Sequence, residues 1–73
     1  MSKLPRLSGR DCAKALGKAG FLFVRQHGSH MILRRKDPFA QLVVPDHQEL
    51  DRGTLRAIIR QAGLGVEQFK ALL

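Results

Sequence analysis

Three short strand-like runs, separated by two tight turns, occupy the centre of this 73-residue chain. They are residues 21–26, 31–34 and 39–44, and they are rich in aromatic, β-branched and other apolar side chains. Such short connections favour an antiparallel meander. Alternation in the middle strand places His30, Ile32 and Arg34 on one face, and Met31, Leu33 and Arg35 on the other. The sequence therefore predicts a three-stranded antiparallel sheet.

Helical segments flank these strands on both sides. Ser8 is a suitable N-cap for a first helix that ends near Gly20. A second helix begins near Asp51 and ends at Gly63. Its apolar stripe is Leu55, Ile58, Ile59 and Ala62. The predicted fold class is α+β in the order α-β-β-β-α, with both helices on one face of the sheet and the other face open.

Two terminal segments complete the predicted chain. Residues 1–7 form a basic extended lead, and residues 66–73 a short amphipathic helix. The length allows one domain, residues 1–73. The four aromatic side chains are expected in its core: Phe21, Phe23, Phe39 and Phe69.

Cellular location is indicated by what the sequence lacks. It has no apolar run of about 18 residues to cross a membrane, and its start lacks the apolar segment of a signal peptide. The single Cys12 cannot form an internal disulfide. We therefore expect a cytoplasmic protein without a membrane partner.

Charge is the strongest compositional signal. Thirteen Lys and Arg stand against six Asp and Glu, a formal net charge of +7. Such an excess attracts polyanions. It favours a nucleic-acid partner over an anionic membrane surface, because no helix combines a broad apolar face with a lysine-rich one.

The residues able to perform chemistry point to imidazole catalysis on RNA. The six carboxylates are scattered, and the three histidines lack the i, i+4 spacing of common zinc motifs, so we expect no metal and no other cofactor. An RNA 2′-hydroxyl can attack the adjacent phosphate if one group removes its proton and another protonates the leaving oxygen. His30 is the candidate base or acid, and His47 a possible second proton carrier. Arg25 and Arg34 could stabilise charge. The first turn is predicted at His27-Gly28, so His27 is most simply a solvated turn residue.

Several segments, in order, resemble the HicA-type toxins of toxin–antitoxin pairs. They are Gly20-Phe21, the run Arg25-Gln26-His27-Gly28-Ser29-His30, then Val44-Pro45-Asp46-His47, and residues 53–63. The resemblance covers nearly the whole chain, and the order and spacing of the segments are specific. One position departs from it: His27 stands where a lysine or arginine is more often expected.

This resemblance implies a double-stranded-RNA-binding-domain-like fold and an mRNA interferase that cleaves mRNA and halts translation. It identifies His30 as the catalytic histidine, and Gly28 and Ser29 as the residues that shape the turn presenting it. It also implies a HicB-type antitoxin that blocks the active site. The side chains expected to contact RNA are Arg25, Arg34, Arg35, Lys36 and His47.

Two other functions fit the residues alone. A non-catalytic module could hold double-stranded RNA with the same basic surface. An interaction domain could instead use its charge for a protein partner only. The resemblance favours the ribonuclease toxin over both.

Overall fold

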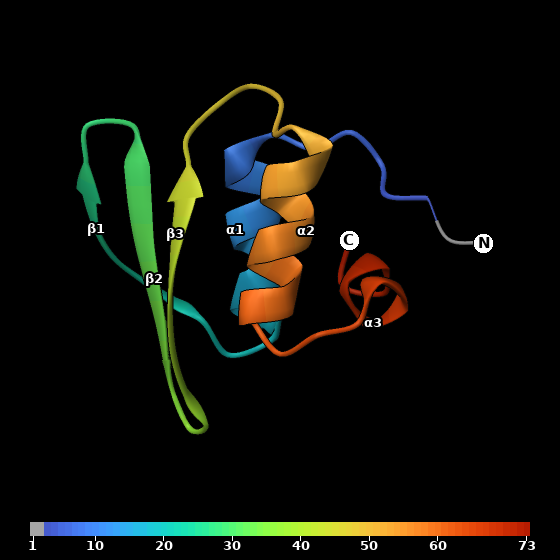
Figure 1. Ribbon diagram of the computed structural model, residues 1–73. Coiled ribbons are helices and arrows are strands. Elements are labelled where there is room, and N and C mark those ends of the chain that lie inside the picture. The colour runs from blue at the N-terminus through green and yellow to red at the C-terminus, as the bar shows by residue number, and fades with distance from the viewer. Residues whose placement is uncertain (1–2) are drawn as a thin grey trace.

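The computed structural model describes residues 3–73 and has two layers, a sheet and a group of helices (Figure 1). Met1 and Ser2 of the predicted N-terminal lead lie outside the described residues. The elements in chain order are α1 (Gly9–Lys18), β1 (Leu22–His27), β2 (His30–Lys36), β3 (Phe39–Pro45), α2 (Arg52–Gln61) and α3 (Val66–Lys70). This order confirms the predicted α+β class.

The sheet is an antiparallel meander in the order β1-β2-β3, as predicted. Its first turn differs from the expectation by one residue. His27 belongs to β1, and the turn consists of Gly28 and Ser29. Gly28 has a φ of +56°, whereas Ser29 does not have a positive φ, and this combination favours a glycine at the first turn position. The turn is therefore flanked by two histidines, His27 as the last residue of β1 and His30 as the first residue of β2.

Side-chain caps define where α1 and α2 begin. The Ser8 hydroxyl accepts a hydrogen bond from the amide of Asp11 at 3.0 Å, and the Asp51 carboxylate accepts one from the amide of Thr54 at 3.0 Å. Both caps satisfy amides that the first helical turn leaves without a partner. The two predicted helix starts are confirmed, whereas α3 ends three residues before the predicted limit.

One face of the sheet forms the core together with the helices. Met31 and Leu33 of β2 are buried there with the α2 stripe, which includes Leu55 and Ile58. Figure 1 shows α1 and α2 on the same side of the sheet, which confirms that prediction. The opposite face of the sheet is left open.

The prediction that all four phenylalanines lie in the core is wrong for two of them. Phe21 and Phe69 are buried, but Phe23 is 57% exposed and Phe39 is 70% exposed. Phe23 lies on β1, an edge strand that is exposed along its whole length. Phe39 lies opposite Lys36 in the register, on the open face. Across residues 3–73, no helix has both the length and the hydropathy that crossing a membrane requires.

Candidate functional site

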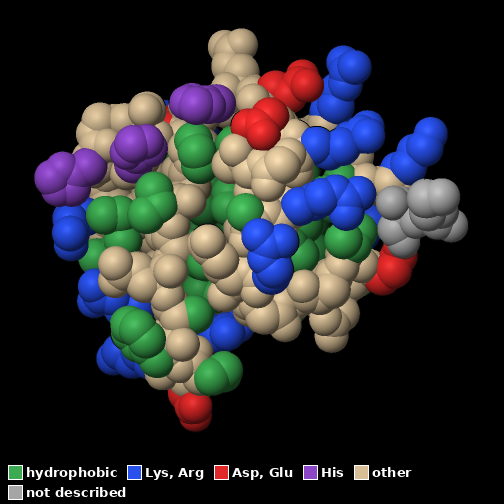
Figure 2. All heavy atoms as spheres, viewed as in Figure 1, with side chains coloured by type: hydrophobic (Ala, Val, Ile, Leu, Met, Phe, Trp, Pro, Cys, Tyr) green, Lys and Arg blue, Asp and Glu red, His purple; other side chains and the backbone are tan. Residues whose placement is uncertain are grey.

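The histidine side chains gather at one end of the sheet, beside the β1–β2 turn (Figure 2). His30 is the first residue of β2, and its side chain is exposed. Its cross-strand partner on β1 is His27, and its partner on β3 is Pro45. Residues directly opposite each other in an antiparallel pair project from the same face. The two imidazoles are therefore neighbours, and both are accessible to a large substrate.

Further cross-strand rows extend along the open face away from His30, with one register shift on β1 between Phe23 and Arg25. Arg25, Ile32 and Val43 form the next cross-strand row. Leu22, Arg34 and Gln41 follow, and then Lys36 with Phe39. The face thus carries cations beside apolar side chains, of which Leu22, Val43 and Phe39 are exposed and Ile32 is buried.

The strands carry cations but no counter-charges. Within the described residues, β1, β2 and β3 contain no Asp or Glu. At about 3.4 Å per residue, Arg25 is one row, or about 7 Å, from the histidine pair, and Arg34 is about 14 Å from it. Arg25 is therefore the open-face cation nearest to the histidine pair. Arg34 and Lys36 are placed to contact neighbouring parts of a polyanion.

The predicted RNA-contacting residues do not all lie on this face. Arg35 points to the helix side, where its guanidinium carbon lies 4.6 Å from the Phe21 ring centroid and its Nε donates to the Pro38 carbonyl at 2.9 Å. Arg34 lies on the open face and donates from Nε and Nη2 to the Gln41 side-chain oxygen at 3.1 and 2.9 Å. These bonds orient the Arg34 guanidinium, and its Nη1 group can still donate to a phosphate.

Asp46 connects three segments around the histidines. Its carboxylate accepts hydrogen bonds from Arg10 Nε at 3.1 Å and Arg10 Nη2 at 3.3 Å on α1, and from Gln26 Nε2 at 3.1 Å on β1. Gln26 Nε2 also donates to the Gly28 carbonyl at 3.0 Å, and the Asp46 amide donates to the Ser29 carbonyl at 2.6 Å. The turn that separates His27 from His30 is therefore fixed from β1 and from the end of β3.

These contacts also determine the charge of Asp46. The hydrogen bond from Arg10 lowers the pKa of the Asp46 carboxyl, and the bond from Gln26 lowers it further. The side chain of Asp46 is 18% exposed, whereas that of Arg10 is 78% exposed. Asp46 is thus an ionised acceptor at neutral pH, which suits a positioning role better than proton transfer.

His47 follows Asp46 in the loop after β3. Its carbonyl accepts a hydrogen bond from the amide of Gly9 at 2.8 Å, which anchors the loop to the start of α1. With Ser8, Arg10 and Asp46 it lines a depression of about 320 Å³. His47 is exposed there and lies outside the sheet.

A protein-family model described as the HicA toxin of bacterial toxin–antitoxin systems matches residues 9–64. The chain belongs to the HicA toxin family. The match includes the histidine pair, the Asp46 network and the open face of the sheet. No curated protein sequence matches the chain. As a HicA toxin, this protein has an antitoxin as its partner in a toxin–antitoxin system.

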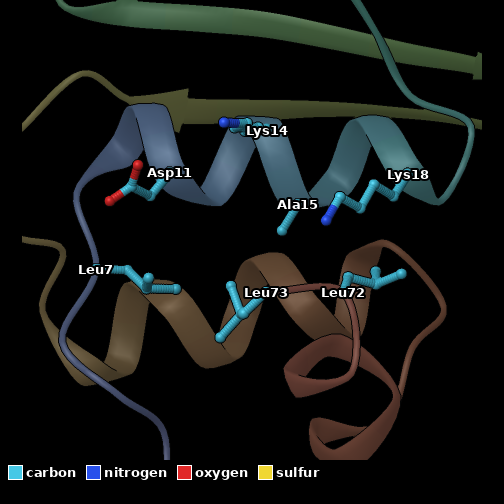
Figure 3. A pocket seen from close by; sticks show the side chains of 7 residues that line it. All are labelled: Leu7, Asp11, Lys14, Ala15, Lys18, Leu72 and Leu73. Atoms are coloured by element: carbon cyan, nitrogen blue, oxygen red, sulfur yellow. The ribbon is translucent and has the colours of Figure 1, made fainter.

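A second hollow of the HicA chain lies on the helix layer and contains no histidine. It has a volume of about 300 Å³ and is lined by α1 residues together with Leu7, Leu72 and Leu73 (Figure 3). It is not part of the histidine end of the sheet. Within residues 3–73, no three His, Cys, Asp or Glu side chains come together in a group that could hold a metal ion.

Sequence reasoning missed two features of this HicA site. One is the pairing of His27 with His30, because the turn was expected one residue earlier in the chain. The Gly28-Ser29 dipeptide, with glycine first, was the signal for the observed turn. The other is the Asp46 network. Arg10 and Asp46 are 36 residues apart, and no local pattern indicates that they meet.

Proposed function

We propose that this HicA toxin is an endoribonuclease that cleaves mRNA without a metal ion and thereby halts translation. His30 is its catalytic residue, a general base or acid in the attack of a 2′-hydroxyl on the adjacent phosphate. The observation that carries the proposal is the position of His30. It is an exposed imidazole on a strand face whose charged groups are all cations.

Each part of this face has a use in RNA cleavage. An imidazole can exchange protons near neutral pH. Arg25, one row from His30, is suited to stabilising the negative charge that develops on the phosphate. RNA carries its own nucleophile in the 2′-hydroxyl, so this reaction requires no metal-bound water. DNA lacks that hydroxyl and should not be cleaved.

The open face is also suited to holding the RNA strand. Arg34 and Lys36 provide cations for phosphates further from the cleaved bond, and the exposed Phe39 ring lies beside Lys36. Aromatic rings stack on unpaired bases, and each such contact contributes about 1–3 kcal/mol. The RNA-contacting role predicted for Arg35 is not favoured by its position on the helix side. His47 can contact RNA at the edge of the site.

The first experiment incubates the purified protein and its His30→Ala variant with an mRNA in EDTA. We expect the wild-type chain to cleave it to products with a 2′,3′-cyclic phosphate and a 5′-hydroxyl. The variant should be inactive, yet equally folded by circular dichroism, because exposed substitutions usually change stability by less than about 0.5 kcal/mol. Products that carry a 5′-phosphate would contradict the mechanism. Salt-dependent RNA binding without cleavage by either protein would favour the non-catalytic module.

A charge-matched pair tests the role of the open face. Arg34→Gln and Lys14→Gln each remove one cation, the first from the open face and the second from α1 on the helix layer. We expect Arg34→Gln to weaken RNA binding and to reduce its salt dependence, and Lys14→Gln to change both much less. Equal effects would mean that only net charge matters.

The partner is proposed to be a HicB-type antitoxin that covers His30. The net charge of +7 favours an inhibitor with an acidic surface. Protection of His30 from diethyl pyrocarbonate in the complex would support this arrangement. Unchanged reactivity of His30 in a complex that no longer cleaves RNA would contradict it.

A further inference from the structure

We infer that His27 is the second proton-transfer residue of this site and acts together with His30. The inference rests on the proposed ribonuclease function, and it concerns a step that the function itself leaves open. Cleavage through the 2′-hydroxyl needs two proton transfers at opposite ends of the reacting phosphate, and one imidazole supplies one of them.

The geometry that supports this inference is the register of the first hairpin. His27 and His30 are direct cross-strand partners and close a two-residue turn. The Cα atoms of such a pair lie about 5.5 Å apart, and their side chains project from the same face. Both side chains are exposed. A phosphate between the two imidazoles would therefore have a proton carrier on each side.

The backbone conformation of the turn and its hydrogen bonds hold this spacing. Gly28 adopts a positive φ, which a residue with a Cβ atom rarely tolerates. The Gly28 and Ser29 carbonyls accept hydrogen bonds from Gln26 Nε2 and from the amide of Asp46. The pair is thus held on two paired strands at a fixed turn, and two coordinated proton transfers require such fixed positions.

The alternatives to His27 are less well placed. The other cross-strand neighbour of His30 is Pro45, whose side chain carries no exchangeable proton. His47 lies beyond the end of β3, in a loop that its own carbonyl anchors to α1. His27 is therefore the titratable residue that the sheet register places directly beside His30.

The charged groups around the pair are few. Arg25 lies one row away on β1, on the same face, and adds positive charge beside both rings. Asp46 provides the nearby carboxylate, with Arg10 bound to it, and His47 follows it in the chain. A phosphate that binds between the imidazoles meets positive charge from Arg25, and the Asp46 charge is compensated by Arg10.

The proposed step balances without any additional reactant. One imidazole, neutral at the start, takes the 2′-hydroxyl proton while the 2′-oxygen forms a bond to phosphorus. The bond from phosphorus to the 5′-oxygen breaks, and the second imidazole, protonated at the start, donates its proton to that oxygen. The products are a 2′,3′-cyclic phosphate and a 5′-hydroxyl, and the two imidazoles have exchanged protonation states.

The test compares wild type, His27→Ala, His30→Ala and His47→Ala on a short RNA in EDTA, with all four proteins checked for folding by thermal melting. This RNA is made in two forms, one normal and one with sulfur in place of the 5′-bridging oxygen at the cleaved position. A thiol has a pKa of about 8.5, so a thiolate leaves without being protonated. A variant that lacks only the general acid therefore regains activity on the sulfur substrate.

We expect His27→Ala to lose about 10²-fold or more in kcat on normal RNA, which is the usual contribution of general acid–base catalysis. Sulfur should restore cleavage by one of the His27 and His30 variants and not by the other. The wild-type rate should fall on both sides of a pH optimum, and His27→Ala should lose one side of that profile.

The inference is overturned if His27→Ala cleaves normal RNA within about threefold of wild type, or if sulfur restores both variants or neither. It is also overturned if His47→Ala shows the sulfur rescue instead. Absence of wild-type cleavage would overturn the proposed function, and this inference with it. Wild-type cleavage that needs His30 but not His27 would overturn this inference alone.

Discussion

Replacing Gly9 with alanine should destabilise the fold, although alanine is normally the better helix residue. Gly9 is the first residue of α1 and is buried against the end of β3. A Cβ atom there would lie 1.8 Å from the carbonyl oxygen of Pro45 and 2.9 Å from its carbonyl carbon. These are backbone atoms, so the clash cannot be relieved by a side-chain rotation. Overpacking of this kind costs about 1–3 kcal/mol.

Gly17 provides the matched control in the same helix. A Cβ atom at Gly17 meets no heavy atom within 4 Å, and its φ is not positive. Gly17→Ala should therefore stabilise the chain by about 0.5–1 kcal/mol through the loss of backbone freedom in the unfolded state. The two substitutions are chemically identical, so their opposite signs isolate the contact with Pro45.

The assay is thermal unfolding followed by circular dichroism. For a domain of this size, 1 kcal/mol shifts Tm by about 4–8 °C. We expect Tm to fall by roughly 4–24 °C in Gly9→Ala and to rise by about 2–8 °C in Gly17→Ala. A Tm for Gly9→Ala equal to or above that of wild type would refute the reasoning. At a temperature where Gly9→Ala is folded, its displaced β3 end should also reduce RNA cleavage.

Two further predictions concern pH. The pKa of Asp46 is lowered in the folded chain, mainly by the hydrogen bond from Arg10. The ionised Asp46 side chain therefore stabilises the fold above its unfolded pKa of about 3.9, and this stabilisation is lost as the pH falls below that value. Asp46→Asn should therefore show a smaller fall in urea midpoint below about pH 4 than wild type, and an equal fall would contradict the role of the Arg10 bond. Burial raises the pKa of the Cys12 thiol from 9.0 to about 11, so the unfolded chain ionises first and stability falls as the pH rises between these values. The urea midpoint of Cys12→Ala should change less over that range, and parallel curves for the two proteins would refute the assignment.

Local signals predicted most of the fold. The Ser8 and Asp51 caps and the α2 apolar stripe act within a few residues of chain, so the sequence displays them directly. The exposure of Phe23 and Phe39 could not be predicted in that way. It depends on how far the helix layer extends over β1 and on which face is covered, and these are properties of the assembled tertiary structure.

The candidate site likewise combines residues that local sequence signals indicate with contacts that only the tertiary structure shows. His30 stands out by residue type and by its neighbour Gly28, and the catalytic role assigned to it remains a prediction. The contacts that fix its surroundings link α1 to the end of β3 and β1 to the Asp46 carboxylate, across long sequence separations. The position of His27 depended on a turn shifted by a single residue, and such a shift changes which side chains are paired.

The central strand β2 has different requirements on its two faces. Met31 and Leu33 are buried with the helices, whereas His30 and Arg34 lie on the open face. Substitutions at Met31 and Leu33 should therefore act mainly on folding, and those at His30 and Arg34 mainly on activity. A selection for protein abundance would be sensitive to substitutions at Met31 and Leu33. A selection for toxicity would be sensitive to those and also to substitutions at His30 and Arg34. Comparison of the two mutational maps would separate residues kept for folding from residues kept for activity, within a single strand.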